Sequence, residues 1–258
     1  MSVDWTALDR ELAQWQSDSR TIPLWWRDDD AVAVTRALER LATLSARLNL
    51  PVHLAVIPAG AEPELADFVH ATEHLIPVQH GWSHANHATG GRKKAELGAD
   101  RPTSEVLREL GQGHERMKTL FGKRFSPMLV PPWNRIAPEV VEGLPRLGFS
   151  HLSTYTPRAA RLAAPGLVQV NTHIDPIDWK GTRGLVPPDR VIAGLVSTLE
   201  DRRSGKTDPE EPLGLLTHHL VHDEAIWDFT GALLERLLTG PARPWTIPAS
   251  QTDKRTPE

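Results

Sequence analysis

The 258-residue sequence contains no cysteine. Disulfide bonds and thiolate metal sites are therefore excluded, and any bound metal must be held by histidine, aspartate or glutamate. Basic clusters are also missing, and a formal net charge of −4 gives no electrostatic reason to expect nucleic acid or anionic lipid as a partner. No stretch approaches about eighteen consecutive apolar residues, so no membrane span is expected. The first residues lack the basic and apolar regions of a signal peptide, which predicts a cytoplasmic protein.

Tyrosine and phenylalanine are scarce, with one and five residues against nine tryptophans. Tryptophan stacks on the C–H faces of sugars but also fills protein cores, so this usage favours carbohydrate only slightly. The remaining composition, 40% hydrophobic and 24% charged, is enough for a sizeable globular core. We expect one domain over residues 1–248, with a helix over 4–16 packed on it, and a disordered polar tail over 249–258.

Short apolar segments alternate with segments of helical periodicity along the whole chain. Strands are expected at 22–27, 52–57, 76–79, 127–130, 149–153, 168–172, 213–217 and 245–247. Helices are expected at 34–48, 63–73, 103–120, 138–147, 188–199 and 224–238. This alternation indicates βαβ units and an α/β fold with a parallel sheet, and the number of repeats favours closure into a barrel over an open sheet.

Three adjacent carboxylates, Asp28, Asp29 and Asp30, directly follow the first expected strand, and His80 and His84 follow the third. Neighbouring carboxylates repel one another, and a bound dication would turn this repulsion into attraction. Aspartate and histidine together suit Zn²⁺ or a similar divalent ion. The alternative interpretation is a solvated acidic turn beside two unrelated surface histidines.

Other polar groups also come directly after expected strands. They are the segment 131–135, the pair Asp178 and Trp179, and the pair His218 and His219. The carboxyl ends of parallel barrel strands open onto one face, where active sites are built, so we expect these groups to converge. Alternation along a strand sends His218 and His219 to opposite sides, so only one of them faces the site, and His218 is favoured.

The segment Leu24–Asp30, followed by His80-Gly-Trp-Ser-His84, resembles the polysaccharide deacetylases, the NodB-homology proteins of carbohydrate esterase family four. In that family one strand ends in Phe-Asp-Asp-Gly, and another leads into His-(Ser/Thr)-x-x-His. The resemblance spans residues 22–225. It implies a distorted (β/α)₇ barrel and the metal-dependent removal of N- or O-acetyl groups from sugars.

The resemblance implies a role for each matching residue. Asp28 would be the general base, Asp29 would complete a metal triad with His80 and His84, and His218 would be the general acid. The implied cofactor is a divalent metal, Zn²⁺ first, with Co²⁺, Ni²⁺ or Mn²⁺ as alternatives. The residues expected to contact the substrate are Trp82, Trp133, Asn134, Arg135, Asp178 and Trp179.

Within this last group the resemblance gives Asp178 the task of ordering the site, and Trp179 that of walling the acyl pocket. Asp175 ranks below Asp178 as the residue that orders the site.

Several positions depart from the family pattern, which indicates a divergent branch. Asp30 stands where the family has glycine, and Gly81 replaces the usual serine or threonine. Val130 stands where the family has the arginine that orients the catalytic aspartate, and Arg135 is a candidate replacement.

The expected function is hydrolysis of an acetyl group on a small or lipid-linked saccharide, by metal-activated water, an aspartate base and a histidine acid. Two alternatives stay open. One is hydrolysis of another non-peptide C–N bond on the same barrel. The other is a catalytically silent barrel that binds carbohydrate or a protein partner. The sequence does not indicate the oligomeric state.

Overall fold

The computed structural model describes residues 3–248. The strands of this part of the chain are β1 (Ile22–Ala31), β2 (Val52–Val56), β3 (Leu75–His80), β4 (Met128–Val130), β5 (His151–Leu152), β6 (Leu162–Ala164), β7 (Leu167–Gln169), β8 (Leu213–Thr217) and β9 (Ala242–Pro244). Its α-helices are α1 (Thr6–Ser17), α2 (Arg36–Leu48), α3 (Pro63–Ala71), α4 (Thr103–Phe121), α5 (Pro138–Gly143), α6 (Pro188–Arg203) and α7 (Glu224–Thr239). The expected N-terminal helix is α1, whereas the tail expected over 249–258 lies outside the described residues.

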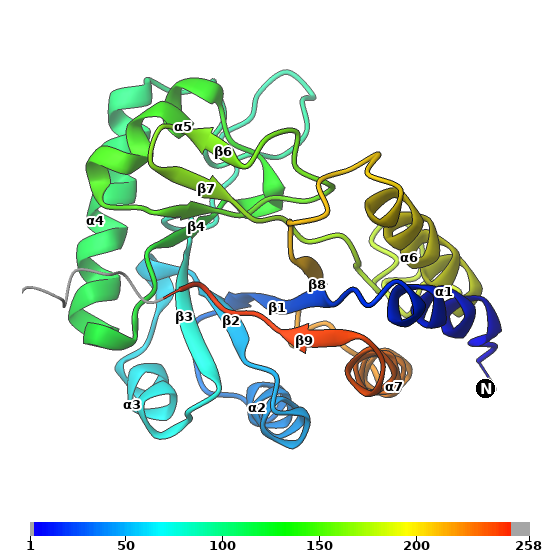
Figure 1. The fold of residues 1–258 in the computed structure, drawn as a ribbon. Coiled ribbons are helices and arrows are strands. Elements are labelled where there is room, and N and C mark those ends of the chain that lie inside the picture. Colours follow the sequence, from blue (N-terminus) through cyan, green and yellow to red (C-terminus); the bar gives the residue numbers. More distant parts are fainter. Residues whose placement is uncertain (1–2, 249–258) are drawn as a thin grey trace, which may run out of the picture.

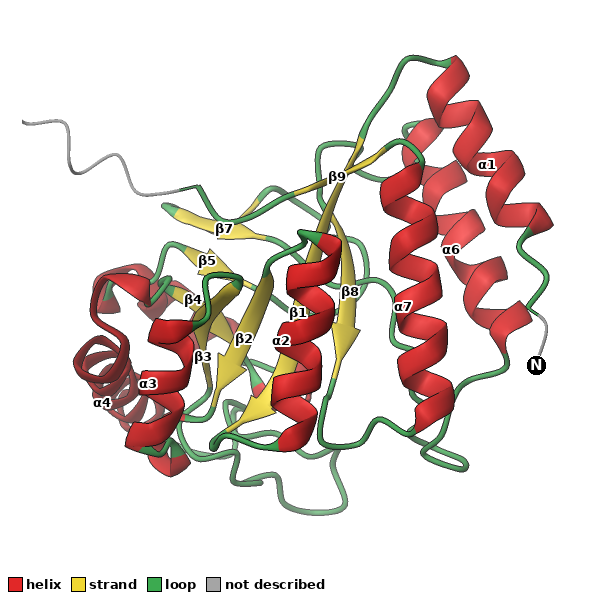
Figure 2. Cartoon of the chain, turned by 90° about the horizontal axis from the view of Figure 1, so that it is seen from below, coloured by secondary structure: helices red, strands yellow, loops and turns green. Residues whose placement is uncertain are grey.

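The central sheet is mostly parallel, in the order β7-β5-β4-β3-β2-β1-β8, with β6 antiparallel to β7 at one end. The segment that contains Ile174 follows β7, at one end of the sheet, and pairs with β8, at the other end. Ile174 N–H donates to Gly214 O, and Leu216 N–H donates to Ile174 O, so the segment runs parallel to β8. The helices pack around the outside of the sheet (Figures 1 and 2). The expected α/β fold, a distorted (β/α)₇ barrel, is confirmed.

Alternation along β1 places its side chains in two different cores. Trp25 packs inside the barrel with Ala55 and Val78, whereas Leu24 and Trp26 pack outward in the core beneath the surrounding helices. The arrowheads of β1, β2 and β8 point to the lower edge of Figure 2, where long loops gather. The acidic run at the end of β1 is therefore delivered to this loop-covered end of the sheet.

The last described residues fill the other end of the barrel. β9 pairs in parallel with the first half of β1, and Trp245 N–H then donates to Leu24 O. The ring of His53 is fully buried between Trp25, at 5.3 Å between centroids, and Trp245, at 5.9 Å. Burial lowers the pKa of His53 to about 4.

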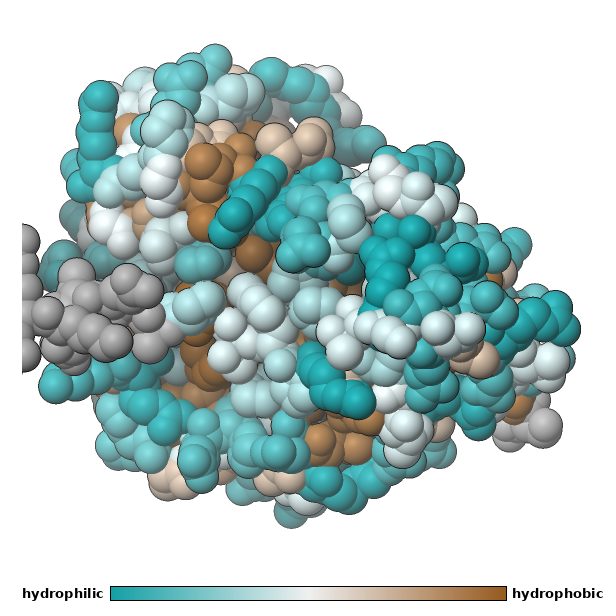
Figure 3. Space-filling view, viewed as in Figure 1, coloured by the Kyte–Doolittle hydropathy of each residue, from teal (hydrophilic) through white to brown (hydrophobic). Residues whose placement is uncertain are grey.

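Most apolar side chains point inward, which leaves a largely polar outer surface. The face in Figure 3 is largely hydrophilic, and its apolar residues show mostly in recesses between polar ones. Within residues 3–248, no helix combines the length and apolar character needed to cross a bilayer.

Candidate active site

The three consecutive aspartates of β1 have three different surroundings, because a β-bulge interrupts the strand. Three residue steps from Asp28 to Ala31 face only two steps on β2, and Asp30 has a positive φ of 76°. A non-glycine residue rarely adopts this conformation, and such residues often cluster at functional sites. The bulge breaks the alternation of side chains, so Asp29 and Asp30 both reach the open end of the barrel while Asp28 faces outward.

Asp30, rather than Asp29, lies beside the two histidines. Its Oδ1 is 3.2 Å from His80 Nε2 and 3.3 Å from His84 Nε2. These three side chains form the only group among residues 3–248 whose ligand atoms lie close enough to share a metal ion. The expected triad of Asp29, His80 and His84 is therefore not the group that the structure brings together.

The group formed by Asp30, His80 and His84, called the ligand group below, fits a divalent cation. Asp30 Oδ1 is buried without a hydrogen bond, although both histidine nitrogens are near it. His80 Nδ1 lies 3.0 Å from the carbonyl oxygen of Val130, which places the proton on Nδ1 and leaves Nε2 as a free lone pair. Three ligand atoms thus converge on one region, and two neutral imidazoles with one carboxylate are a common ligand set for catalytic zinc.

The electrostatic field of the site also favours a cation. Burial acts to raise the pKa of Asp30, but the adjacent His80 ring, with the charges of His218 and His84, outweighs it and holds this pKa far below its usual range. Burial acts to lower the pKa of His80, but the negative charges of Asp29 and Asp30 raise it. The field that favours a proton on His80 equally favours a metal ion.

Asp29 is held by a buried arginine on its own strand. Arg27 and Asp29 are two residues apart and face the same side, with Arg27 Nε 2.9 Å from Asp29 Oδ1 and Nη2 donating to Oδ2 at 3.0 Å. The remaining guanidinium hydrogens donate to Asn134 Oδ1 at 2.8 Å and Ser153 Oγ at 2.8 Å. Arg27 is fully buried, and Asp29 is 3% exposed. Arg27 thus contacts one carboxylate of the acidic run through both of its oxygens.

Among the described residues, Arg135 has no ion pair with an aspartate of the acidic run. Its Nη1 donates to the carbonyl oxygen of Lys94, on the loop that follows β3. Arg27 heads the acidic run but was not predicted as a site residue, because the expected arginine was tied to the position of Val130 in the family pattern. Strand alternation supplies the signal, since Arg27 and Asp29 must share a face.

Asp28, the expected general base, points away from this group. Its carboxylate is fully buried and accepts hydrogen bonds from Thr217 Oγ1 at 2.6 Å and His219 Nδ1 at 2.5 Å. Burial acts to raise the pKa of Asp28, but the charge and hydrogen bond of His219, with the bond from Thr217, lower it below its usual range. The carboxylate of Asp28 therefore bonds to the end of β8, whereas that of Asp29 bonds to Arg27.

His218 and His219 lie on opposite sides of the chain, as alternation predicts. His218 Nε2 lies 4.0 Å from Asp29 Oδ2, and its ring meets Trp179 edge-on at 4.7 Å between centroids. Trp179 Nε1 donates to Asp175 Oδ2 at 2.8 Å. Asp175 is largely buried, and burial raises its pKa, so this carboxylate belongs to the site.

Within residues 3–248, the Asp178 side chain makes only local hydrogen bonds. Its side chain accepts hydrogen bonds from the N–H groups of Gly181 and Thr182 and so closes the turn that follows Trp179. The structure thus brings Asp175, rather than Asp178, into contact with the Trp179 ring that packs on His218. Asp175 could have been recognised as the first acidic residue after the barrel segment that closes onto β8.

The turn between His80 and His84 depends on a buried glutamate. Glu96 accepts hydrogen bonds from the backbone N–H groups of Trp82, at 3.2 Å, and Ser83, at 2.7 Å. Gly81 has a φ of 56°, and a Cβ at this position would collide with the Glu96 carboxylate. The glycine that departs from the family pattern is thus the residue that allows Glu96 to hold the turn.

The remaining predicted substrate contacts divide into two groups. Trp133 lies 4.3 Å from the ring of His84, and Asn134 is bonded to Arg27, so both border the site. Both have a φ of 56°, which places two strained residues next to the bulge at Asp30. Trp82 is half-buried, and its ring has no aromatic contact among the described residues.

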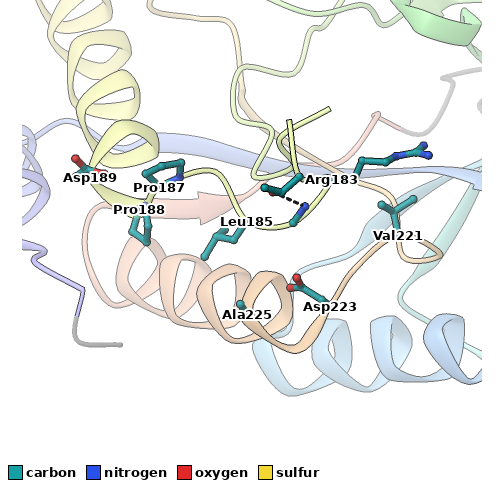
Figure 4. A pocket seen from close by; sticks show the side chains of 10 residues that line it. Arg183, Leu185, Pro187, Pro188, Asp189, Val221, Asp223 and Ala225 are labelled. Atoms are coloured by element: carbon teal, nitrogen blue, oxygen red, sulfur yellow. Dashed lines mark hydrogen bonds between the residues drawn. The ribbon is translucent and has the colours of Figure 1, made fainter. Parts of the chain in front are cut away.

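Two hollows are each lined by a residue that contacts Arg27 or Trp179. One, of about 570 Å³, is lined by Asn134, Arg135, Thr154 and Gln169 among others. The other, of about 670 Å³, lies between the segment before α6 and the start of α7 and is shown in Figure 4. Its lining residue Arg183 lies over the ring of Trp179 at 5.6 Å. Neither hollow is lined by any of the aspartates or histidines discussed above.

Comparison with solved structures defines the class of fold. The chain has the fold of the polysaccharide deacetylases, and the resemblance expected from the sequence is confirmed at this level. No protein-family model matches the chain, and no curated protein is similar to it in sequence.

Three solved structures illustrate this likeness. A family 4 carbohydrate esterase from Streptomyces lividans, in complex with acetate, has a TM-score of 0.54 and 12% identity, with 89% of this chain and 95% of that chain covered. The peptidoglycan deacetylase PdaC from Bacillus subtilis has a TM-score of 0.55 and 13% identity, with 88% of each chain covered. A mutant family 4 pseudoenzyme with restored enzymatic activity has a TM-score of 0.57 and 12% identity, with 87% of this chain and 65% of that chain covered.

Proposed function

We propose that this chain is a metal-dependent deacetylase that hydrolyses an N-acetyl or O-acetyl group of a saccharide. The observation that carries the proposal is the convergence of three candidate ligands, a buried carboxylate and a histidine at one end of the barrel. Asp30, His80 and His84 form the ligand group, while Asp29 and His218 lie 4.0 Å apart beside it. The fold shared with deacetylases and esterases supports the same chemistry.

Asp30, His80 and His84 are the residues that would hold a divalent ion, Zn²⁺ first, with Co²⁺, Ni²⁺ or Mn²⁺ as alternatives. Such an ion polarises an acyl oxygen and lowers the pKa of water. Three protein ligands leave coordination positions open, as catalytic metal sites require.

Asp29 takes the role of general base. A water molecule that attacks the acetyl carbon must lose a proton, and Asp29 is the carboxylate next to the ligand group that is not one of its members. Arg27 fixes the orientation of this carboxylate by contacts to both of its oxygens. The C–N or C–O bond then breaks, and acetate is one product.

His218 takes the role of general acid. Its Nε2 faces Asp29. In its protonated form, the imidazole would donate a proton from Nε2 to the departing amine or alcohol. Trp179 packs against the ring and is itself bonded to Asp175, so the imidazole is confined on one side. Proton transfer of this kind typically contributes about 10²–10⁴-fold to the rate.

The saccharide would occupy the hollow next to Arg27. Amide and hydroxyl groups from Asn134, Thr154 and Gln169 line this space of about 570 Å³, which lies within the range of small-molecule sites. Trp179 packs against the His218 ring and is 39% exposed. Its exposed aromatic surface would contact an acetyl group or the face of a sugar. A small or lipid-linked saccharide is the proposed substrate, and the protein is proposed to act in the cytoplasm.

Two other functions use the same site. Hydrolysis of another non-peptide C–N bond would need the same base, acid and ligand group. A silent carbohydrate-binding barrel is the second alternative, because one of the similar structures is a pseudoenzyme whose activity was restored by mutation.

Acetate release from N-acetylated glucosamine oligomers tests the proposal. We expect turnover that a chelator abolishes and that Zn²⁺, Co²⁺ or Mn²⁺ restores. Turnover that survives complete metal removal would contradict the role of the ligand group. Saccharide binding without turnover in any of these metals would favour the silent barrel, whereas release of other acids from a panel of acylated amines would favour a different C–N hydrolase.

A further inference from the structure

Asp28 is surrounded by hydrogen-bond donors from the end of β8. Its Oδ2 accepts from Thr217 Oγ1 at 2.6 Å and from the backbone N–H of His219 at 3.0 Å, and its Oδ1 accepts from His219 Nδ1 at 2.5 Å. Trp26 Nε1 donates in turn to Thr217 Oγ1 at 2.8 Å. Asp28 and these partners are buried, so the bonds are not weakened by solvent.

These bonds hold the two residues on either side of His218. Thr217 precedes it and His219 follows it, and both are tied to the same carboxylate on β1. Because side chains alternate, fixing these two neighbours on the outer face directs the His218 side chain to the inner face. There its Nε2 lies 4.0 Å from Asp29 Oδ2.

A buried carboxylate is a costly way to gain stability alone, because apolar residues of similar volume often do as well or better. An apolar residue at Asp28, however, offers no acceptor for the backbone N–H of His219. The hydrogen bonds of Asp28 therefore fix the direction of the backbone at His218, which apolar packing alone would not do.

We propose that Asp28 is a positioning residue that aims His218 at the reacting centre by binding Thr217 and His219. The inference rests on the proposed function, in which His218 protonates the leaving group. Among the described residues, the Asp28 side chain has no hydrogen bond or ion pair with Asp29, Asp30, His80 or His84.

Comparison of two substrates separates positioning of an acid from general damage to the site. An N-acetylated amino sugar needs a proton on its departing amine, whereas an aryl acetate has a leaving group that departs without one. We expect Asp28→Ala to lower kcat on the amide by about 100-fold or more and on the aryl acetate by less than about 10-fold. His218→Ala should show the same selectivity, while Asp29→Asn should lower both.

Asp28→Asn provides the matched control. Its side-chain oxygen still accepts from Thr217 and from the His219 N–H, so we expect it to recover most of the amide turnover that Asp28→Ala loses. Equal losses on both substrates in Asp28→Ala, or unchanged amide turnover, would overturn the proposal. If Asp28→Ala does not fold, Thr217→Val tests the same contact, and an unchanged ratio of amide to ester turnover would count against it.

A crystal structure of the same variant gives an answer that does not depend on activity. In Asp28→Ala or Thr217→Val we expect His218 Nε2 to move away from its position 4.0 Å from Asp29 Oδ2. An unchanged position would refute the positioning role even in an active enzyme. Wild-type protein that releases acetate from neither substrate in any metal would refute the proposed function, and the structural comparison would still decide the role of Asp28.

Discussion

Replacing Asp29 and Asp30 separately by asparagine should produce two different defects. Asp30 contributes the only carboxylate to the group with His80 and His84, and its Oδ1 lies within 3.3 Å of both imidazole nitrogens. Asp29 instead contacts Arg27 through both oxygens. We therefore expect Asp30→Asn to lose metal and Asp29→Asn to keep metal but lose turnover.

The expected magnitudes follow from these contacts. Residues that only orient metal ligands typically cost about 10–100-fold in metal affinity when replaced, so loss of the charged ligand Asp30 should cost more than about 100-fold. Loss of a general base lowers kcat by about 10²–10⁴-fold, which corresponds to about 3–5 kcal/mol in the barrier. The amide oxygen introduced by Asp29→Asn can still accept the bond from Arg27 Nη2, so this variant should bind metal within about 10-fold of the wild type.

Metal titration by calorimetry and acetate release with saturating metal measure the two effects independently. The reasoning would be refuted if Asp29→Asn lost the metal while Asp30→Asn retained it, because the register first expected from the sequence would then be correct. Retained turnover in Asp29→Asn at saturating metal would exclude this carboxylate as the base.

Three further variants test the surroundings of the site and the barrel interior. Arg27→Met leaves the buried Asp29 charge without a partner and should lower the free energy of unfolding by about 3–5 kcal/mol in a urea titration, whereas a loss below about 1 kcal/mol would show that the pair is not needed. Gly81→Ser introduces a collision with Glu96 at a positive φ, so it should weaken metal binding and destabilise the protein by about 1–3 kcal/mol. Calorimetry measures the metal affinity and thermal unfolding measures the stability, and wild-type values of both would contradict this account. The pKa of His53 falls from 6.5 in the unfolded chain to about 4 in the folded one, so the unfolded state binds the proton first and acidification from about pH 6.5 to 4 should remove about 3 kcal/mol of stability. His53→Gln should lack this part of the pH dependence in urea titrations, and an identical pH slope in wild type and variant would refute the assignment.

The fold could be predicted from the sequence because it depends on patterns spread over many residues. Alternating strand and helix periodicities indicated the barrel, and the same alternation put His218 and His219 on opposite sides, as the structure has them. Such patterns are redundant, so one irregular residue does not obscure them.

The order of the three aspartates could not be predicted because it depends on one irregular residue. A regular strand would place Asp28 and Asp30 on one face and Asp29 on the other. The bulge with its positive φ at Asp30 brings Asp29 and Asp30 to the same end instead, and nothing in the composition of the run reveals where the extra residue lies. The structure therefore brings Asp30, rather than Asp29, to the two histidines.

The pairing of β1 with β8 bears on how the protein is made in the cell. Asp28 and Thr217 are 189 residues apart, so the strand that carries the acidic run is synthesised long before the strand that covers its edge. Until then β1 presents open backbone groups and apolar side chains to other chains, the condition under which nascent barrels aggregate. Chaperone binding before β8 emerges should therefore raise the yield of folded protein, and an expressed fragment that stops before Leu213 should be insoluble.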